Sequence, residues 1–267
     1  MPAYRAIVLL PLLAACTWAG AVSYTFEPPT FSGSSFGAGG VALSGQDGWL
    51  TGGGLASGSV FTYGSPIPVP PGGGSQFVAM QPGDENYVDG LSFAGSSEWA
   101  ITFDILVYSF SGGNNAGGSF YLFADSTGYQ LHAFPYQTSG STWNAKFDVF
   151  NPNGTPNNGV DLGGGFDGLQ MDHWYQEQIV LNTTSNQILS VSIDDPGNPA
   201  ANATDDPSGW YLYGGASAAF SVGGLGLRGI GTLGFDDISL DAVPEPASWT
   251  LWLAGAAALC YLRGRRR

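Results

Sequence analysis

The chain has 267 residues, with 42 glycines, 13% aromatic residues and a formal net charge of −14. A disordered chain would lack so many aromatic residues, so the composition predicts a folded, loop-rich domain. All 21 acidic residues lie between Val22 and Pro246, against two basic residues, Lys146 and Arg228, which leaves this segment at about −19. Nucleic acid is excluded as a partner, because neutralising its phosphates needs a basic surface.

The N-terminus carries the pattern of an export signal. Arg5 and the α-amine precede an apolar run from Ala6 to Ala15, and Ala19-Gly20-Ala21 supplies small residues for cleavage. An alternative is lipidation at Cys16, because Leu13-Ala14-Ala15-Cys16 resembles the bacterial lipobox. The only other cysteine is Cys260, so no disulfide or thiolate chemistry is available to the body of the chain.

Short runs of alternating polar and apolar residues predict β-strands in the body. The run "AITFDILVYSF" places Ile101, Phe103, Ile105 and Val107 on one face. Residues 119–134 predict a hairpin around a Ser-Thr-Gly turn. Further strands are expected at 143–150, 173–182, 187–195 and 232–240. Since no helical period persists in the body, we predict an all-β fold, an antiparallel sandwich of the jelly-roll kind.

Glycine-rich and acidic segments between the strands are expected to be loops. Ser32–Gly58 is one of them. Pro82–Gly90, with Asp84, Glu85 and Asp89, is interpreted as a solvated turn, because its spacing does not fit an EF-hand.

The body offers little for catalysis. It contains two histidines, His132 and His173, and no Gly-x-Ser-x-Gly motif, whereas a hydrolytic triad usually needs a histidine base beside its nucleophile. A zinc site would need three or four His or Cys ligands. Asp104, Asp148 and Glu177 lie on expected strands without a glycosidase spacing. We therefore expect no enzyme.

Binding of a carbohydrate requires less. Sugar rings stack on aromatic side chains, and polar neighbours fix their hydroxyl groups. Tyr108, Tyr121 and His132 lie on strand faces opposite the expected core, so they are predicted as a set to contact a glycan. Three tryptophans in or near loops are interpreted as packing in the core or at its rim: Trp49, Trp99 and Trp210.

The C-terminus combines three features. Val243-Pro244-Glu245-Pro246 stays extended, because its prolines fix φ and remove two backbone donors. Ala247–Leu262 carries no charge, and as a helix it would cover about 24 Å, slightly less than a hydrocarbon core of about 30 Å. Under the positive-inside rule four arginines would hold its far end in the cytoplasm: Arg263, Arg265, Arg266 and Arg267. The sequence thus predicts a single transmembrane helix with the body outside.

This order of motif, apolar run and terminal arginines resembles the PEP-CTERM sorting signal. The resemblance covers residues 243–267. It implies recognition by an exosortase, a membrane-embedded transpeptidase of Gram-negative bacteria that make exopolysaccharide. Removal of the tail would leave the protein in the envelope, on the outer surface or in the extracellular matrix. Exosortase and signal peptidase would then be its processing partners.

The body is similar, over fewer residues, to concanavalin/laminin-G-like and carbohydrate-binding jelly rolls. The similarity is carried by an opening Thr25–Glu27, by Gly45–Trp49 and by a closing Phe235–Leu240. It implies that the first and last strands pair with each other.

That pairing would bring Glu27 near Asp236 and Asp237, where many carbohydrate-binding modules hold a structural calcium ion. Carboxylate oxygens suit this hard cation. Adjacent residues of a regular strand face opposite ways, so both aspartates could act as ligands only at a bulge or through a backbone oxygen. The alternative is that both are exposed charges near the end of an edge strand.

We therefore expect a signal peptide at residues 1–21, a β-sandwich domain at 22–242 and a sorting tail at 243–267. The favoured function is a non-enzymatic exported protein of the cell surface or exopolysaccharide matrix. The alternatives are a carbohydrate-binding module with a structural calcium ion and an envelope glycosidase.

Overall fold

The computed structural model describes residues 21–243, apart from 37, 53, 65–66, 71–72, 111–117 and 125–127. The expected signal peptide, the expected transmembrane helix and the terminal arginines lie outside these residues. In the described part, no helix has the length and apolar character needed to cross a membrane.

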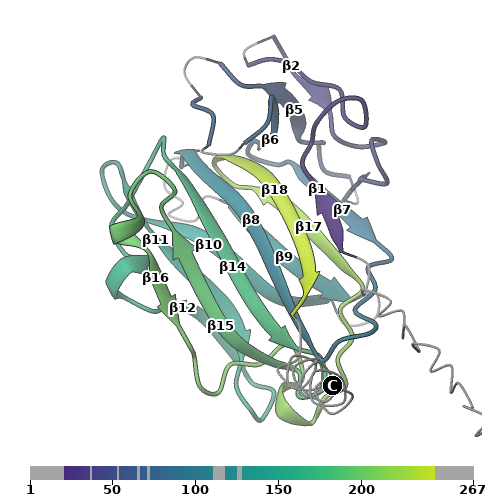
Figure 1. Ribbon diagram of the computed structural model, residues 1–267, viewed down its shortest axis with the longest axis vertical. Coiled ribbons are helices and arrows are strands. Elements are labelled where there is room, and N and C mark those ends of the chain that lie inside the picture. The colour runs from purple at the N-terminus through teal and green to yellow at the C-terminus, as the bar shows by residue number, and fades with distance from the viewer. Residues whose placement is uncertain are drawn as a thin grey trace, which may run out of the picture.

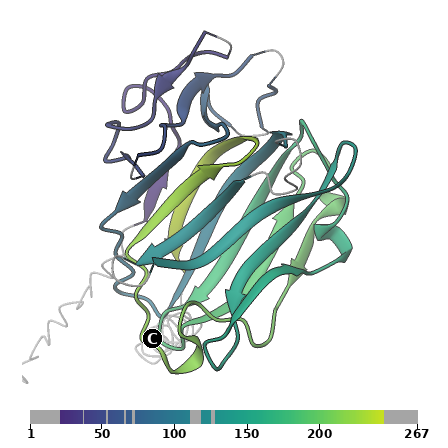
Figure 2. The same ribbon diagram turned by 180° about the vertical axis from the view of Figure 1, so that it is seen from behind.

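Two β-sheets pack face to face, and Figures 1 and 2 show them from opposite sides. The first sheet has the order β16 (Ala203–Asp205), β15 (Gln187–Asp194), β14 (Trp174–Asn182), β8 (Glu98–Ser109), β18 (Thr232–Ala242), β6 (Gln76–Met80), β5 (Ser59–Thr62), β2 (Ser34–Ser35), with β1 (Val22–Tyr24) beside β18 and β3 (Val41–Ala42) beside β5.

The second sheet has the order β12 (Pro156–Asp161), β11 (Thr142–Phe150), β10 (Gly128–Ser139), β9 (Gly118–Ala124), β17 (Gly224–Gly229), β7 (Glu85–Asp89), β4 (Leu50–Thr51), with β13 (Leu169–Gln170) beside β11. Three short 3₁₀ helices lie in connections: η1 (Gly164–Phe166), η2 (Pro199–Ala201) and η3 (Gly215–Ser217). Among the described residues the strand pairs are antiparallel, except that β2 runs parallel to β5. The predicted all-β sandwich is confirmed, and its jelly-roll connectivity stays a prediction.

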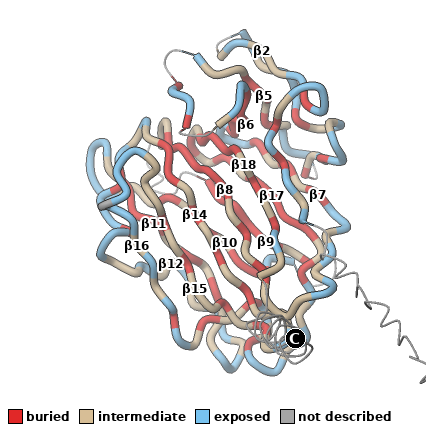
Figure 3. Tube along the Cα trace, in the orientation of Figure 1, coloured by how far each residue is buried: buried red, intermediate tan, exposed pale blue. Residues whose placement is uncertain are grey.

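The main core lies between the sheets and follows the predicted alternation. Ile101, Phe103, Ile105 and Val107 of β8 are all buried there. Phe103 stacks on Phe120 of β9 across the sandwich, with ring centroids 4.3 Å apart. Figure 3 shows buried positions along most of the central strands and exposed ones mainly in the connections. Burial confirms the interpretation of the three tryptophans as packing residues: Trp49, Trp99 and Trp210.

A second, smaller aromatic cluster covers part of the outer face of the first sheet. The segment between β5 and β6 contributes Tyr63 and Ile67, which pack near Phe77 and Trp174. The Trp174 indole donates a 2.7 Å hydrogen bond to the Pro68 carbonyl. This face of the sheet is therefore closed at the end where the N-terminal strands lie (Figure 1).

The main core also contains a carboxyl group. Glu177 of β14 lies opposite Phe103 and Ile193 in the register and is 2% exposed. Neither of its carboxyl oxygens has a hydrogen-bond partner in the described part of the chain. Burial raises the pKa of Glu177 to about 8, because the charged form would lose its hydration without compensation.

We predict that Glu177→Gln changes how stability depends on pH. Folded wild type retains the Glu177 proton up to about pH 8, whereas the unfolded chain releases it near 4.5. The native state therefore binds more protons in this window, and wild-type stability falls as pH rises through it. Thermal melting at pH 5 and pH 9 should show Glu177→Gln gaining several degrees on wild type at the higher pH. The control Glu98→Gln, on β8, should show the same change of melting temperature with pH as wild type. The same change for wild type, Glu177→Gln and Glu98→Gln would contradict the prediction.

Candidate functional site

The register of the second sheet aligns residues from five strands on its outer face. Tyr87 of β7 lies opposite Gly226 of β17, which lies opposite Tyr121 of β9. Tyr121 in turn lies opposite His132 of β10, and His132 lies opposite Asp148 of β11. Because residues along a strand alternate between faces, these residues form one polar and aromatic row that points away from the core.

Tyr121 occupies the middle of this row. Its ring covers Gly226, where any Cβ would collide with it. Its hydroxyl donates a 2.7 Å hydrogen bond to Oε1 of Glu85, and the residue is only 3% exposed. Burial and the Glu85 carboxylate raise the pKa of Tyr121. The phenol therefore stays neutral and holds Glu85 in place.

His132 and Asp148 form a pair beside Tyr121. His132 Nδ1 lies 3.4 Å from Asp148 Oδ2, and Asp148 Oδ1 accepts a 2.7 Å hydrogen bond from the Gly159 amide. Burial by itself would raise the pKa of Asp148, but the bonds from His132 and Gly159 outweigh it and lower that pKa. His132 Nε2 is buried without a hydrogen-bond partner in the described part of the chain.

A β-bulge brings a further aromatic residue to the same face. The register of β10 against β9 shifts between Tyr129 and Leu131, so that Tyr129 lies opposite Phe123 while His132 lies opposite Tyr121. In a regular strand, Tyr129 and His132 would point to opposite faces. Here the two rings meet edge to face with centroids 4.3 Å apart.

A cavity of about 440 Å³ opens on this face. Acidic and aromatic residues of β7 line it together with aromatic residues of β9 and β10. The residues that line it include Glu85, Tyr87, Asp89, Tyr121, Phe123 and Tyr129. Tyr129 is 42% exposed at its rim.

The structure separates the three residues that the sequence grouped as glycan contacts. Tyr121 and His132 lie together, but Tyr108 lies on the first sheet, where it packs against Phe36 with centroids 5.9 Å apart. Tyr108 therefore cannot share a ligand with the other two, because the core lies between the sheets. Tyr121 is a buried support rather than an exposed platform.

Sequence reasoning also missed the acidic wall of the cavity. Pro82–Gly90 was interpreted as a solvated turn, whereas Glu85–Asp89 is strand β7. The signal was present in the alternation of "ENYVD", whose second and fourth residues, Asn86 and Val88, face inward and are buried. The short length of the segment and the preceding Pro-Gly-Asp concealed it.

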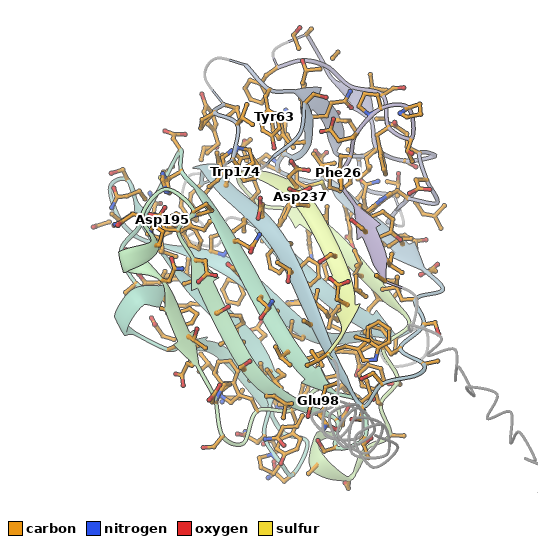
Figure 4. The ribbon with its side chains drawn as sticks, viewed as in Figure 1. Phe26, Tyr63, Glu98, Trp174, Asp195 and Asp237 are labelled. Carbon is orange, nitrogen blue, oxygen red and sulfur yellow. The ribbon has the colours of Figure 1, made fainter. Side chains whose placement is uncertain are left out.

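The residues predicted to hold calcium lie on the opposite side of the molecule. The first and last strands pair as expected, with Tyr24 opposite Ile238. The register of β18 against β8 shifts between Asp236 and Ser239, and Asp237 has a φ of 45°. This bulge lets both aspartates avoid the core. Figure 4 shows Asp237 near Phe26, Tyr63 and Trp174, at the closed end of the first sheet.

Protein donors already occupy these carboxylates. Asp236 accepts a 2.6 Å hydrogen bond from the Tyr63 hydroxyl and one of 2.9 Å from the Asp237 amide. Glu27 accepts hydrogen bonds of 2.6 Å from both the amide and the hydroxyl of Ser75. Asp104 lies directly opposite Asp236 in the register.

The electrostatics of this cluster are those of buried acids. Burial, together with the nearby Asp237 carboxylate, raises the pKa of Asp236 to about 8 and that of Asp104 to about 6. Asp236 is fully buried on an interior strand, so the alternative of an exposed charge on an edge strand is wrong for it. Across the described ranges, no group of three or more His, Cys, Asp or Glu side chains is arranged to hold a metal ion. Calcium at Glu27, Asp236 and Asp237 stays a prediction.

The second histidine forms a separate pair. His173 Nε2 lies 2.9 Å from Asp195 Oδ1, which also accepts hydrogen bonds from the amides of Gly197 and Asn198. These bonds outweigh the effect of burial and lower the pKa of Asp195. Asp195 directly follows β15 and His173 directly precedes β14, the strand paired with β15 in the first sheet, so the pair does not belong to the row on the second sheet.

Comparisons with known proteins bear on the tail and on the fold. Residues 242–267 match the PEP-CTERM protein-sorting motif, as predicted. This motif indicates an exported protein that an exosortase sorts to the cell envelope of a Gram-negative bacterium. No curated protein matches the chain significantly.

Similar solved structures include three that cover most of this chain. The carbohydrate esterase vb_24B_21 from Shiga toxin-encoding bacteriophage phi24B is 15% identical with a TM-score of 0.49, over 84% of this chain and 100% of that one. The cellulose-induced protein Cip1 is 14% identical with a TM-score of 0.47, over 83% and 97%. The CBM2 module of the evolved Dit of Lactobacillus casei BL23 phage J-1 is 13% identical with a TM-score of 0.41, over 76% and 94%. Similarities this low carry no argument about activity or ligand.

We predict that Asp236→Asn flattens the pH dependence of stability between pH 5 and pH 9. The pKa of Asp236 is about 8 in the folded protein and near 3.8 in the unfolded chain, so wild type loses stability as pH rises through this window. Thermal melting over the pH range measures the slope. Adding calcium at pH 8 provides a second readout. A rise in the melting temperature of wild type, with no rise for Asp236→Asn, would support the calcium prediction. Equal melting in calcium and in chelator would reject it.

Proposed function

We propose that this chain is a non-enzymatic, exported protein of the cell surface or exopolysaccharide matrix, and that it binds carbohydrate on the outer face of its second sheet. The observation that carries the proposal is the cavity between β7 and β9. It offers aromatic rings, Tyr87, Phe123 and Tyr129, beside carboxylates. Aromatic faces bind the apolar faces of sugars, and nearby polar groups fix the hydroxyls.

The arrangement supports binding over hydrolysis. Glycosidases use two carboxyl groups, one of which acts as a general acid. Glu85, on one face of β7 with Asp89, already accepts the Tyr121 hydroxyl. His132 Nε2 is buried, and the Tyr121 hydroxyl is already bonded to Glu85, so neither presents a free acid or base to the cavity. An envelope glycosidase remains the competing proposal, and release of reducing sugar that one carboxylate substitution abolishes would favour it.

The C-terminal tail supports the part of the proposal that concerns export and processing. Exosortase and signal peptidase would process the precursor, and the apolar run of residues 247–262 would hold it in the membrane until then. The last strand ends at Ala242, which is the first residue matched by the sorting motif. Cleavage in the tail would therefore leave the sandwich whole.

We predict that Tyr87→Ala and Tyr129→Ala each weaken glycan binding by about tenfold, because an aromatic ring packed against a sugar is worth roughly 1–2 kcal/mol. A glycan array with the full-length protein in detergent would identify ligands, and titration calorimetry would measure their affinity. Tyr213→Ala is the matched control, because Tyr213 is 43% exposed and does not line the cavity. Equal affinity of all four proteins would place any binding elsewhere.

We predict that replacing both Pro244 and Pro246 by alanine blocks processing of the tail, because the extended segment that an exosortase would grip is lost. Fractionation of the native host should then show the uncleaved precursor accumulating in the inner membrane. Pro156→Ala, on the exposed edge strand β12, should be processed normally. Normal cleavage of the double variant would contradict the role of the motif.

A further inference from the structure

We propose that one end of the sandwich rests on the lipid surface while the sorting tail still holds the chain in the membrane. This end, which we call the neutral end, consists of three connections: Leu91–Ser97, Thr183–Asn186 and Gly214–Gly223. The inference rests on the proposed retention of the precursor in the membrane, and it adds the orientation of the folded body.

Hydrogen bonds join the three connections of the neutral end into one surface. The Thr183 amide donates a 2.8 Å bond to the Ser97 carbonyl, which links the second connection to the first. The side-chain amide of Asn186 donates a 3.1 Å bond to the Gly215 carbonyl, which links the second connection to the third. A flat partner such as a bilayer would therefore meet all three together.

The tail leaves the body at the neutral end. The Val243 amide donates a 2.9 Å hydrogen bond to the Glu98 carbonyl, and the Ser96 hydroxyl donates one of 3.1 Å to the Val243 carbonyl. The main chain is thus tied to the body up to Val243. The apolar run begins four residues later, at Ala247, and four residues of extended chain span at most about 14 Å. Since the headgroup layer is about 5–8 Å thick on each side of a bilayer, this short tether holds the neutral end close to the headgroups.

The charge pattern favours the same orientation. The neutral end carries no acidic or basic residue, and the carboxylates beside it lie on the strands themselves, at Asp89, Glu98 and Asp241. Connections at the opposite end carry three carboxylates: Asp84, Asp172 and Asp195. Figure 4 shows Glu98 near one end of the sandwich and Asp195 toward the other. Anionic headgroups repel carboxylates within about a Debye length, ~8–10 Å, so repulsion is least when the neutral end faces the lipid.

Two phenylalanines give the neutral end an apolar centre. The half-buried rings of Phe93 and Phe220 meet edge to face, with centroids 5.1 Å apart. Phe93 also contacts Trp99, which lies opposite Ala242 in the register, so the pair is close to the exit of the tail. Apolar rings in an uncharged surface suit the boundary between headgroups and acyl chains. A charged protein partner would find no ion pair to form here.

In this orientation the strands rise away from the membrane. The twelve residues of β8 alone span about 40 Å at about 3.3 Å per residue, so the connections at the opposite end lie far from the lipid. The cavity on the outer face of the second sheet would open to the side. It would therefore be accessible to polysaccharide before the tail is cut.

The test measures how close single labelled cysteines lie to lipid. Cys16 and Cys260, both in the targeting segments, are first replaced by serine. The protein, purified from its host in detergent with the tail intact, carries one fluorophore at an exposed position: Ala94→Cys or Thr184→Cys in the neutral end, or Ser139→Cys in the hairpin at the opposite end. It is reconstituted into phosphatidylcholine liposomes, with or without phosphatidylglycerol, that contain a quencher attached to lipid headgroups. We expect loss of fluorescence at positions 94 and 184 and none at position 139.

A charge variant tests whether neutrality matters. Ala94→Glu should reduce the quenching at position 184 in liposomes with phosphatidylglycerol but not in phosphatidylcholine alone, because only anionic headgroups repel the new carboxylate. Ser139→Glu is the matched control and should change the quenching in neither. An unchanged signal for Ala94→Glu would overturn the inference.

The remaining outcomes separate this inference from the proposed retention in the membrane. Equal quenching at both ends, or none at positions 94 and 184 in protein that co-sediments with the liposomes, would overturn the inference and keep the retention. Cross-linking of position 94 to the exosortase in the host, without quenching in liposomes, would make the neutral end a surface for protein docking instead. Failure of the protein to co-sediment with liposomes would overturn the retention and the inference with it.

Discussion

The insertion of the last strand, β18, into the middle of the first sheet is the constraint on which the rest of the structure depends. β18 pairs with β8 along most of its length and with β6 and β1 on its other side. The first sheet therefore closes only after the last strand has been made, and the chain must form many contacts between distant residues. The same strand places Asp236 opposite Asp104 and ends beside Glu98, whose carbonyl accepts a 2.9 Å hydrogen bond from the Val243 amide. The sorting tail thus begins at a fixed point of the sandwich.

The two sheets use their outer faces differently. At one end of the first sheet, the aromatic cluster that contains Trp174 also contains Tyr63, whose hydroxyl bonds to Asp236. Burial there raises the pKa values of Asp236 and Asp104. The second sheet leaves its face open, and the ring of Tyr121 holds Glu85 at a cavity instead of over a core. The proposed carbohydrate binding therefore belongs to the second sheet, whereas the first carries the carboxyl groups whose pKa values burial raises.

Two glycines have a structural role on the outer face of the second sheet, although most glycines of this chain lie in loops. Gly224 and Gly226 of β17 lie between two strands with aromatic residues, and their missing side chains leave room for the rings of Phe123 and Tyr121 to lie across the sheet. Larger residues there would push both rings away from the surface. The shape of the cavity depends on these two positions as much as on the residues that line it.

The sequence by itself determined the all-β class, the inward face of β8 and the sorting motif, because each follows from a local pattern or from a short contiguous signal. The pairing of the first and last strands was implied only by the resemblance to carbohydrate-binding jelly rolls, and the structure confirms it. Only the tertiary structure decided which side chains meet. The bulges at Tyr129 and at Asp237 turn residues to the face that alternation denies them, and long-range pairing selects where a bulge forms. The short strand β7 and the separation of Tyr108 from Tyr121 likewise depend on sheet order, which residues far apart in the chain fix together.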